Sequence, residues 1–363
     1  MNQKFETQEE MLRAYTDAAV PFVGGAITPA HLELRSWRYF LEINSACSLR
    51  CPTCTKGNVE GYEHKTGIMD ADLMERILDK IKLENPNAIV FAYGNSEPFL
   101  HPKLPECIAS IKRRGLHPEI STNLNYVHRA DELLEAAPDL IIISLSGWSQ
   151  EVYVKGHAGG NIEKVKKNMA ILAAANNARP LERRVKILVN YHIYKDNAHE
   201  APLMEEYATS LGLGFFKSMA RAISMESAVQ YCRAHDPEAT PFEVEEARPD
   251  WNTALPPASK AYAETMDRII INPNEARAMY AHYPVKSVCP VGAGSMFTFI
   301  RHDGKTQLCA CTADRRITIG DYLDTTPEQM IEQRTGHSFC KQCLKYRTNL
   351  YFHIVDIKQW IPE

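Results

Sequence analysis

Six short segments that can each form one β-strand, most of them rich in apolar or β-branched residues, are spaced along residues 38–220 of this 363-residue chain. The clearest is LIIISL at residues 140–145, whose continuous apolarity is typical of a strand buried on both faces. The others lie at residues 38–44, 89–93, 117–122, 185–194 and 215–220. Helical patterns separate the runs, so the sequence predicts an α/β fold with a parallel sheet, either open or closed into a partial barrel.

Residues that can cap helices stand at the start of several segments between the predicted strands. Asp70 precedes a helix that we expect to run to about residue 83, and Asn161 precedes a second apolar stripe. Asn197 is expected to open a third helix, which Gly212 would end. Ligands of parallel α/β folds bind at the carboxyl ends of the strands, so the polar residues that follow each strand form the candidate site.

Composition and charge argue against several other classes of protein. The chain has 41 basic and 45 acidic residues, a net charge of −4, and no Lys- or Arg-rich stretch that would favour nucleic acid as a partner. The N-terminus does not resemble a signal peptide, and no apolar run is long enough to span a membrane. We therefore expect a cytoplasmic protein, in which clustered cysteines indicate metal or redox chemistry before disulfides.

Three cysteines, Cys47, Cys51 and Cys54, follow the first predicted strand in a C-x3-C-x2-C pattern. Three thiolates on one short loop can bind three irons of a 4Fe–4S cubane and leave the fourth iron open. Structural zinc requires four protein ligands, and His64 could complete such a site. The spacing therefore favours an iron–sulfur cluster and keeps zinc as the alternative.

This cysteine pattern resembles that of the radical S-adenosylmethionine (SAM) superfamily, and two later segments agree with it in order. Residues 93–98 (YGNSEP) resemble the family's G-G-E-P segment, and residues 121–123 (STN) resemble its T-N-G segment, with Leu124 where glycine is common. Each match alone could be an ordinary turn or cap. The resemblance covers about residues 37–221 and implies a partial (β/α)6 TIM-like barrel with SAM on the open iron. The SAM-binding residues that it implies are Gly94, Asn95, Ser96, Glu97, Ser121, Asn123, Ser144, Ser146, Lys155 and Asn190.

Further cysteines lie near the C-terminus, after an acidic, proline-rich segment at residues 235–258. Their pattern resembles the auxiliary-cluster domain of radical SAM enzymes, in the short "twitch" form of the SPASM domain. The resemblance implies a second 4Fe–4S cluster, with Cys311 as an alternative to Cys309 and a zinc ribbon as the alternative site. The ligands that it implies are Cys289, Cys309, Cys340 and Cys343. We divide the chain into an N-terminal extension (1–36), a radical SAM core (37–222), a connecting region (223–285) and a small C-terminal iron–sulfur auxiliary domain (286–363).

The resemblance also implies a reaction. SAM would be cleaved reductively to a 5′-deoxyadenosyl radical that takes hydrogen from a substrate C–H bond, with electrons from a donor such as flavodoxin or ferredoxin. An auxiliary cluster would suit oxidation, whereas epimerisation needs a hydrogen donor, for which Cys232 is the candidate thiol and an idle, buried cysteine the alternative. Arg221, just past the sixth predicted strand, could hold an anionic or hydroxylated group, or lie on the surface.

The length of the N-terminal segment bears on the substrate. The 36 residues before the predicted core are too few for the leader-binding module of peptide-modifying relatives. We therefore expect a small polar substrate, such as a sugar, an aminocyclitol or a nucleotide sugar. A radical SAM peptide maturase and a non-catalytic iron–sulfur or zinc scaffold are the alternatives.

Overall fold

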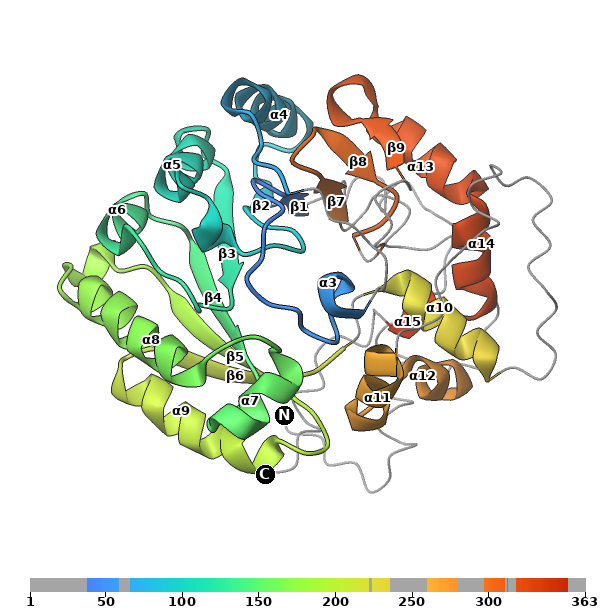
Figure 1. Ribbon diagram of the computed structural model, residues 1–363. Coiled ribbons are helices and arrows are strands. Elements are labelled where there is room, and N and C mark those ends of the chain that lie inside the picture. Colours follow the sequence, from blue (N-terminus) through green and yellow to red (C-terminus); the bar gives the residue numbers. More distant parts are fainter. Residues whose placement is uncertain are drawn as a thin grey trace, which may run out of the picture.

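The computed structural model describes residues 38–58, 66–221, 224–235, 260–279, 297–310, 312 and 318–351. Within these residues a curved sheet has the strand order β6-β5-β4-β3-β2-β1-β7-β8-β9 (Figure 1). Strands β1 to β7 pair in parallel, and β8 and β9 join antiparallel. The strands are β1 (Arg38–Leu41), β2 (Ile89–Phe91), β3 (His117–Thr122), β4 (Leu140–Leu145), β5 (Ile187–Ile193), β6 (Gly214–Met219), β7 (Phe297–Ile300), β8 (Lys305–Gln307) and β9 (Thr318–Asp321). The six predicted strands and the predicted α/β partial barrel are confirmed.

Helices that connect strands β1 to β6 cover the convex side of this sheet, while α3 (Thr55–Asn58) lies on its concave side (Figure 1). Those on the convex side are α4 (Ala71–Glu84), α5 (Leu104–Arg113), α6 (Ala130–Glu135), α8 (Ile162–Asn177) and α9 (Ala201–Ser210). Helix α7 (Gln150–Gly156) follows β4. Shorter 3-10 turns are η1 (Pro98–Leu100), η2 (Leu181–Arg183), η3 (Ala198–Glu200) and η5 (Tyr322–Asp324).

Side-chain caps begin two of these helices as the sequence predicts. Asp70 accepts hydrogen bonds from the backbone N–H groups of Asp72 and Leu73 at 3.0 and 3.1 Å, at the start of α4. Asn161 accepts one from the Lys164 N–H at 2.9 Å, at the start of α8.

Asn197 directly precedes the helical segment as expected, at the N-cap position of η3, but its side chain does not cap the segment because it is used elsewhere. Helix α9 begins at Ala201, after η3. The buried Asn197 amide accepts a hydrogen bond from the Tyr194 N–H at 2.7 Å and donates to the Ser146 carbonyl at 2.9 Å. It therefore ties the ends of β4 and β5 together instead of capping the helix.

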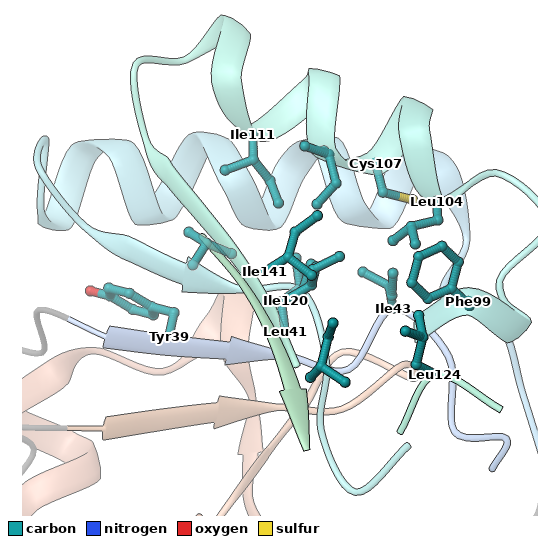
Figure 2. Close-up of a cluster of buried hydrophobic side chains, with 14 of the residues drawn as sticks. Tyr39, Leu41, Ile43, Phe99, Leu104, Cys107, Ile111, Ile120, Leu124 and Ile141 are labelled. Atoms are coloured by element: carbon teal, nitrogen blue, oxygen red, sulfur yellow. The ribbon is translucent and has the colours of Figure 1, made fainter. Parts of the chain in front are cut away.

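The core lies between the sheet and the helices on its convex side, as Figure 2 shows around β1, β3, β4 and α5. Leu41, Ile120 and Ile141 come from the three strands and pack beneath Leu104 and Ile111 of α5. All five are at most 1% exposed. Burying a side chain of this size contributes about 1.5–3 kcal/mol, so this packing fixes the strands and the loops at their carboxyl ends.

The C-terminal strands continue the same sheet, because β7 pairs in parallel with β1 from Arg38↔Phe297 to Leu41↔Ile300. A Cβ atom at Gly94 would lie 2.6 Å from the Phe299 Cζ, so the loop after β2 packs closely on β7. The remaining helices are α10 (Met225–Ala234), α11 (Lys260–Arg268), α12 (Pro273–Met279), α13 (Pro327–Gly336), α14 (Ser338–Lys345) and α15 (Thr348–Tyr351).

One sheet thus contains strands of the predicted core (β1 to β6) and strands of the predicted auxiliary domain (β7 to β9). The division of the chain into four units stays a prediction. Residues 1–37 lie outside the described part of the chain. Among the described residues, no helix combines the length and apolarity needed to cross a bilayer.

Candidate active site

A cavity of about 530 Å³ opens at the carboxyl ends of the parallel strands. Its walls come from the loops after β1 to β4 and from the ends of β5 and β6. The predicted site residues that line it are Cys47, Cys51, Cys54, Gly94, Asn95, Ser96, Glu97, Ser121, Asn123, Ser144, Asn190 and Arg221. The structure therefore brings together residues that are distant in the sequence, at the edge of the sheet where the parallel strands predict a ligand.

The cysteine loop, residues 46–54 between β1 and α3, is anchored by backbone hydrogen bonds. Just before it, the Ser45 N–H donates to the Gly67 carbonyl at 2.9 Å, and the Gly67 N–H donates to the Ser45 Oγ at 2.8 Å. Within it, the Arg50 N–H donates to the Ala158 carbonyl at 3.0 Å, which joins the loop to the turn after α7. These bonds hold the loop across one end of the cavity.

The three thiols of this loop have the chemistry of an iron–sulfur site. Burial raises the pKa of the Cys47 thiol to about 11 and that of Cys51 well above its usual value. Such thiols become thiolates when they bind a cation, as iron clusters require. Among the residues that the structure describes, no three His, Cys, Asp or Glu side chains form a site for a single metal ion. A cubane suits thiols spread along a loop, because its irons occupy separate corners. His64, the alternative zinc ligand, lies outside the described residues.

Glu97 joins three loops at the cavity wall. Its carboxylate, in a residue that is 1% exposed, accepts hydrogen bonds from the Phe99 N–H (3.1 Å), the Thr122 hydroxyl (2.7 Å) and the Asn123 N–H (2.8 Å). Its own backbone N–H donates to the Ala46 carbonyl at 2.8 Å. Burial raises the pKa of Glu97 to about 7, although the hydrogen bonds oppose the shift. The glutamate thus fixes the relative positions of the loops after β1, β2 and β3.

The loop after β3 contains a residue in a conformation that glycine favours. Leu124, which stands where the family commonly has glycine, has a φ of 52°. Its N–H donates to the Thr122 hydroxyl oxygen at 2.8 Å, and its side chain is fully buried. Packing and this hydrogen bond therefore hold the leucine in the left-handed region.

A row of polar side chains crosses the cavity from β3 to β6. The hydroxyls of Ser121 and Ser144 lie 3.0 Å apart, and the Ser218 hydroxyl donates to the Asn190 Oδ1 at 2.6 Å. Ser144 and Asn190 are register partners on β4 and β5, so the two pairs lie side by side. The row presents donors and acceptors that can bind hydroxyl or carboxylate groups.

Two histidines that the sequence analysis missed line the same cavity. His157 follows α7 and stacks on Tyr153 with ring centroids 5.0 Å apart, and its Nδ1 lies 2.8 Å from the Ser146 Oγ. Burial lowers the pKa of His157 to about 3 and that of His192 to about 4, and nearby Arg221 also lowers the latter. Both rings are therefore neutral at pH 7. His192 could have been found from the sequence, because it shares a strand face with Asn190, two residues before it.

Besides the C-terminal cysteines, the predicted site residues Ser146, Lys155 and Cys232 do not line the cavity. Ser146 is 1% exposed and lies behind His157, to which it is hydrogen-bonded. Lys155 is exposed on α7, where its backbone carbonyl accepts a hydrogen bond from Arg268. Cys232 on α10 is fully buried within the hydrophobic core. This burial favours the alternative of an idle, buried cysteine, and the role of Cys232 as a hydrogen donor stays a prediction.

The C-terminal cysteines are described in part. Cys289 and Cys311 lie outside the described residues. Cys340 and Cys343 are on α14, and the buried Cys343 sulfur accepts a hydrogen bond from the Thr348 hydroxyl at 3.1 Å. Cys309, shortly after β8, is half-buried. The auxiliary cluster and the choice between Cys309 and Cys311 stay predictions.

The sequence of this chain is similar to a known family model and to several known proteins. A family model described as "Radical SAM superfamily" matches residues 41–193, which include the cysteine loop and β2 to β5. The chain is 31% identical over 180 residues to the tungsten-containing aldehyde ferredoxin oxidoreductase cofactor-modifying protein of Pyrococcus furiosus, and it spans 48% of that relative. It is 30% identical over 220 residues to a probable GTP 3′,8-cyclase of Methanococcus maripaludis (strain C5), in a match that covers 60% of this chain and 67% of the relative.

Solved structures share the fold. The structure of native anSMEcpe with bound AdoMet aligns with 84% of this chain and 83% of its own, with a TM-score of 0.50 and 15% identity. The structure of Streptococcus suis SuiB bound to its precursor peptide SuiA aligns with 94% of this chain and 73% of its own, with a TM-score of 0.52 and 12% identity. At these identities the likeness concerns the fold alone.

Proposed function

The chain belongs to the radical SAM superfamily, whose cofactors are a 4Fe–4S cluster and SAM, and we propose that it abstracts hydrogen from a small polar substrate. One observation carries the proposal: three cysteines and the polar ends of β2 to β6 line a single cavity. A cofactor held at the cysteines would therefore face a substrate held at the far strands.

In this proposal Cys47, Cys51 and Cys54 bind the cluster, and the neighbouring loops bind SAM. The segment Gly94-Asn95-Ser96, positioned by Glu97, faces the SAM amino group. The row of Ser121, Ser144 and Asn190 receives the ribose and the carboxylate of SAM. When bound, these cofactors supply the one-electron chemistry that activates a C–H bond, and the protein supplies binding, orientation and exclusion of water.

The far side of the cavity suits a hydroxylated or anionic substrate. It presents neutral His157 and His192, the Ser218 hydroxyl, and Arg221 at the end of β6. The acidic residue of the lining, Glu97, is bound by three donors from the protein itself. The names of two relatives refer to reactions of small molecules: one is a probable GTP 3′,8-cyclase, and the other is a cofactor-modifying protein. These features support a carbohydrate-like substrate, such as a sugar, an aminocyclitol or a nucleotide sugar.

We further propose that the reaction is an oxidation that uses an auxiliary cluster at Cys289, Cys309, Cys340 and Cys343. A second cluster can accept the electron that a substrate radical must lose, and an external donor such as flavodoxin or ferredoxin would reduce the first. Oxidation is preferred to epimerisation, because Cys232, the nominated hydrogen donor, is buried away from the cavity.

The first test is cofactor loading and SAM cleavage. After anaerobic reconstitution we expect about eight irons per chain, and release of 5′-deoxyadenosine when dithionite and SAM are added. Cys51→Ala should abolish 5′-deoxyadenosine formation. Cys107→Ala is the matched control, because Cys107 is a buried thiol of α5 that does not line the cavity. A wild-type protein that holds zinc instead of iron, or that holds iron and cleaves no SAM, contradicts the proposal.

The second test separates the two clusters. A double variant, Cys340→Ala with Cys343→Ala, should keep about four irons per chain and keep SAM cleavage, but lose conversion of the substrate. Iron content unchanged from wild type would contradict an auxiliary cluster at these residues. Screening phosphorylated and free sugars for faster 5′-deoxyadenosine release tests the substrate class, and stimulation by a peptide alone would favour the peptide maturase.

A further inference from the structure

We propose that the side-chain amide of Asn123 donates a hydrogen bond to the Cys47 sulfur and thereby raises the reduction potential of the cluster that Cys47 binds. The inference rests on the proposed function, because it takes Cys47 as a cluster ligand. Asn123 would then tune the reduction potential of the cluster through Cys47. This role is additional to the SAM contact that the resemblance implies.

The contact itself lies at the wall of the cavity. The Asn123 Nδ2 is 3.8 Å from the Cys47 Sγ, and both residues line the cavity. Sulfur is a large acceptor, so its hydrogen bonds are longer than those to oxygen. The Cys47 Sγ also accepts the Leu49 N–H at 3.5 Å, a backbone donor within the cysteine loop itself. Asn123 thus adds a donor from a different segment, the loop after β3.

The orientation of the Asn123 amide follows from a chain of hydrogen bonds that begins at a backbone N–H. The Asn161 N–H can only donate, and it points at the Asn125 Oδ1 at 2.8 Å. The Asn125 Nδ2 is therefore on the other side, where it donates to the Tyr153 Oη at 2.8 Å and to the Asn123 Oδ1 at 3.1 Å. The Asn125 backbone N–H donates to the same Asn123 oxygen at 2.9 Å. If the Asn123 amide were flipped, its NH2 group would face these two donors and its oxygen would face the Cys47 sulfur. Neither contact allows a hydrogen bond when Cys47 is a thiolate.

A fixed donor at a ligand sulfur affects the two oxidation states unequally. The reduced cluster carries one more negative charge than the oxidised cluster, so a donor dipole stabilises the reduced form more. Burial strengthens this effect, because little water is present to screen the dipole. Partners of ligand residues tune metal sites in this way without binding the metal.

The decisive experiment is an anaerobic redox titration of the holoenzyme, followed by EPR. The cluster is identified as the one whose EPR signal changes when SAM is added, and the titration is run without SAM. Asn123→Leu has a similar size but no donor. We expect its midpoint to move to a more negative potential, with about a tenfold lower ratio of reduced to oxidised cluster at a fixed potential, equivalent to 59 mV for one electron.

The matched control is Asn176→Leu, because Asn176 is a buried asparagine whose side chain, like that of Asn123, is held by hydrogen bonds. Its amide donates to the Val185 carbonyl and accepts the Val185 N–H, both at 2.9 Å, and it does not line the cavity. Its midpoint should equal that of the wild type. Asn125→Ala should give a smaller negative shift than Asn123→Leu, because the backbone N–H of residue 125 still holds the Asn123 oxygen.

Each result bears on the inference. An unchanged midpoint in Asn123→Leu with full iron content overturns it, as does an equal shift in the Asn176 control. Should Asn123→Leu lose the cluster, Asn123→Ser is titrated instead, because serine is too short to reach the sulfur. Loss of iron in both Asn123 variants also overturns it, since a tuning contact is not needed for assembly. A wild-type protein without iron contradicts the proposed function instead.

Discussion

The two sides of the cavity are held together by different interactions. The cysteine side, formed by the loops after β1, β2 and β3, is cross-linked by directional hydrogen bonds that meet at Glu97. The histidine side, formed by the end of α7 with β5 and β6, combines separate hydrogen-bonded pairs with packed rings. His157 is stacked on Tyr153, and its ring lies 6.1 Å from that of His192. Directional bonds suit a cofactor of constant shape, whereas packed neutral rings can be exchanged to suit a particular substrate. We infer that the cysteine side carries the common chemistry and the histidine side the specificity.

The largest combined loss of stability and of SAM cleavage is expected when Glu97, at the centre of the cysteine side, is replaced. Glu97→Ala removes the acceptor of three hydrogen bonds, two of them buried, which should lower the free energy of unfolding by about 5 kcal/mol. It should also lower 5′-deoxyadenosine formation by about a hundredfold, a loss of about 2.7 kcal/mol, because the loops that hold cluster and SAM separate. Urea denaturation and a SAM-cleavage assay measure the two effects.

The control for this prediction is Glu119→Gln. Glu119 lies on β3, close to the same loops, but it is half-buried and does not line the cavity. We expect SAM cleavage close to that of the wild type in this variant. Equal losses in the two variants would mean that Glu97 supports the barrel in general and not the cysteine side in particular.

On the histidine side, the next largest effect is expected at Gly156. A Cβ atom there would lie 2.3 Å from the Oγ and 3.0 Å from the Cβ of the buried Ser146, the residue hydrogen-bonded to His157. Gly156→Ala should therefore destabilise the fold by about 2–3 kcal/mol through overpacking. Gly336→Ala, at a position with nothing within 4 Å of the new Cβ, should change the stability by no more than about 0.5 kcal/mol. Similar denaturation midpoints for the two variants would show that Ser146 can move aside.

The sequence predicted the cysteine side better than the histidine side, for a physical reason. Strand patterns, helix caps and the order of Cys47, Glu97 and Asn123 are local signals, and the parallel sheet then brings them to one edge. Two of the three carboxylate contacts of Glu97 were not predictable from its own segment, because Thr122 and Asn123 come from the end of β3 and the loop after it. The position of His157 depends on where α7 ends and on a glycine that lets Ser146 approach.

Long-range pairing was the least predictable feature. The sequence analysis treated the C-terminal part as a separate auxiliary domain, yet β7 extends the core sheet beside β1. Just beyond these strands, the Nδ1 of His302 lies 3.1 Å from the carboxylate of Glu42, a residue 260 positions earlier. A strand or helix pattern in the sequence indicates which residues of one element share a face. It does not indicate which residues pair when they are 260 positions apart in the chain.

The neutral histidines predict a loss of stability as the pH falls. Glu97 on the cysteine side has a pKa raised to about 7 and predicts a gain over the same range, so the contribution of His157 is obtained from the difference between wild type and a His157 variant. The folded-state pKa of His157, about 3, is below the unfolded value of about 6.5, so the unfolded chain binds the proton first as the pH falls. The contribution is fully present above pH 6.5 and is lost between pH 6.5 and 3. From pH 7.5 to pH 5 His157 should lower the free energy of unfolding by about 2 kcal/mol. His192 has the same sign, with a pKa of about 4.

Urea denaturation at the two pH values measures this loss, and His157→Gln should reduce it by about 2 kcal/mol while His192 still contributes. The surface residue His199 provides the control, because it is exposed and its replacement by Gln should leave the pH dependence unchanged. A variant at position 157 with the wild-type pH dependence would contradict the assignment of this loss to His157.

The smallest effect is expected just beyond the histidine side, at Cys232. This thiol is fully buried in the core, so Cys232→Ala should cost about 1 kcal/mol of stability for the lost sulfur contacts and leave both SAM cleavage and the product unchanged. Cys232→Ser should cost more, because it buries a hydroxyl in an apolar cluster. Denaturation, 5′-deoxyadenosine release and product analysis with a substrate that the wild type accepts provide the measurements. If the alanine variant cleaved SAM normally but altered the product, α10 would have to move in turnover, and the specificity side of the cavity would extend to that helix.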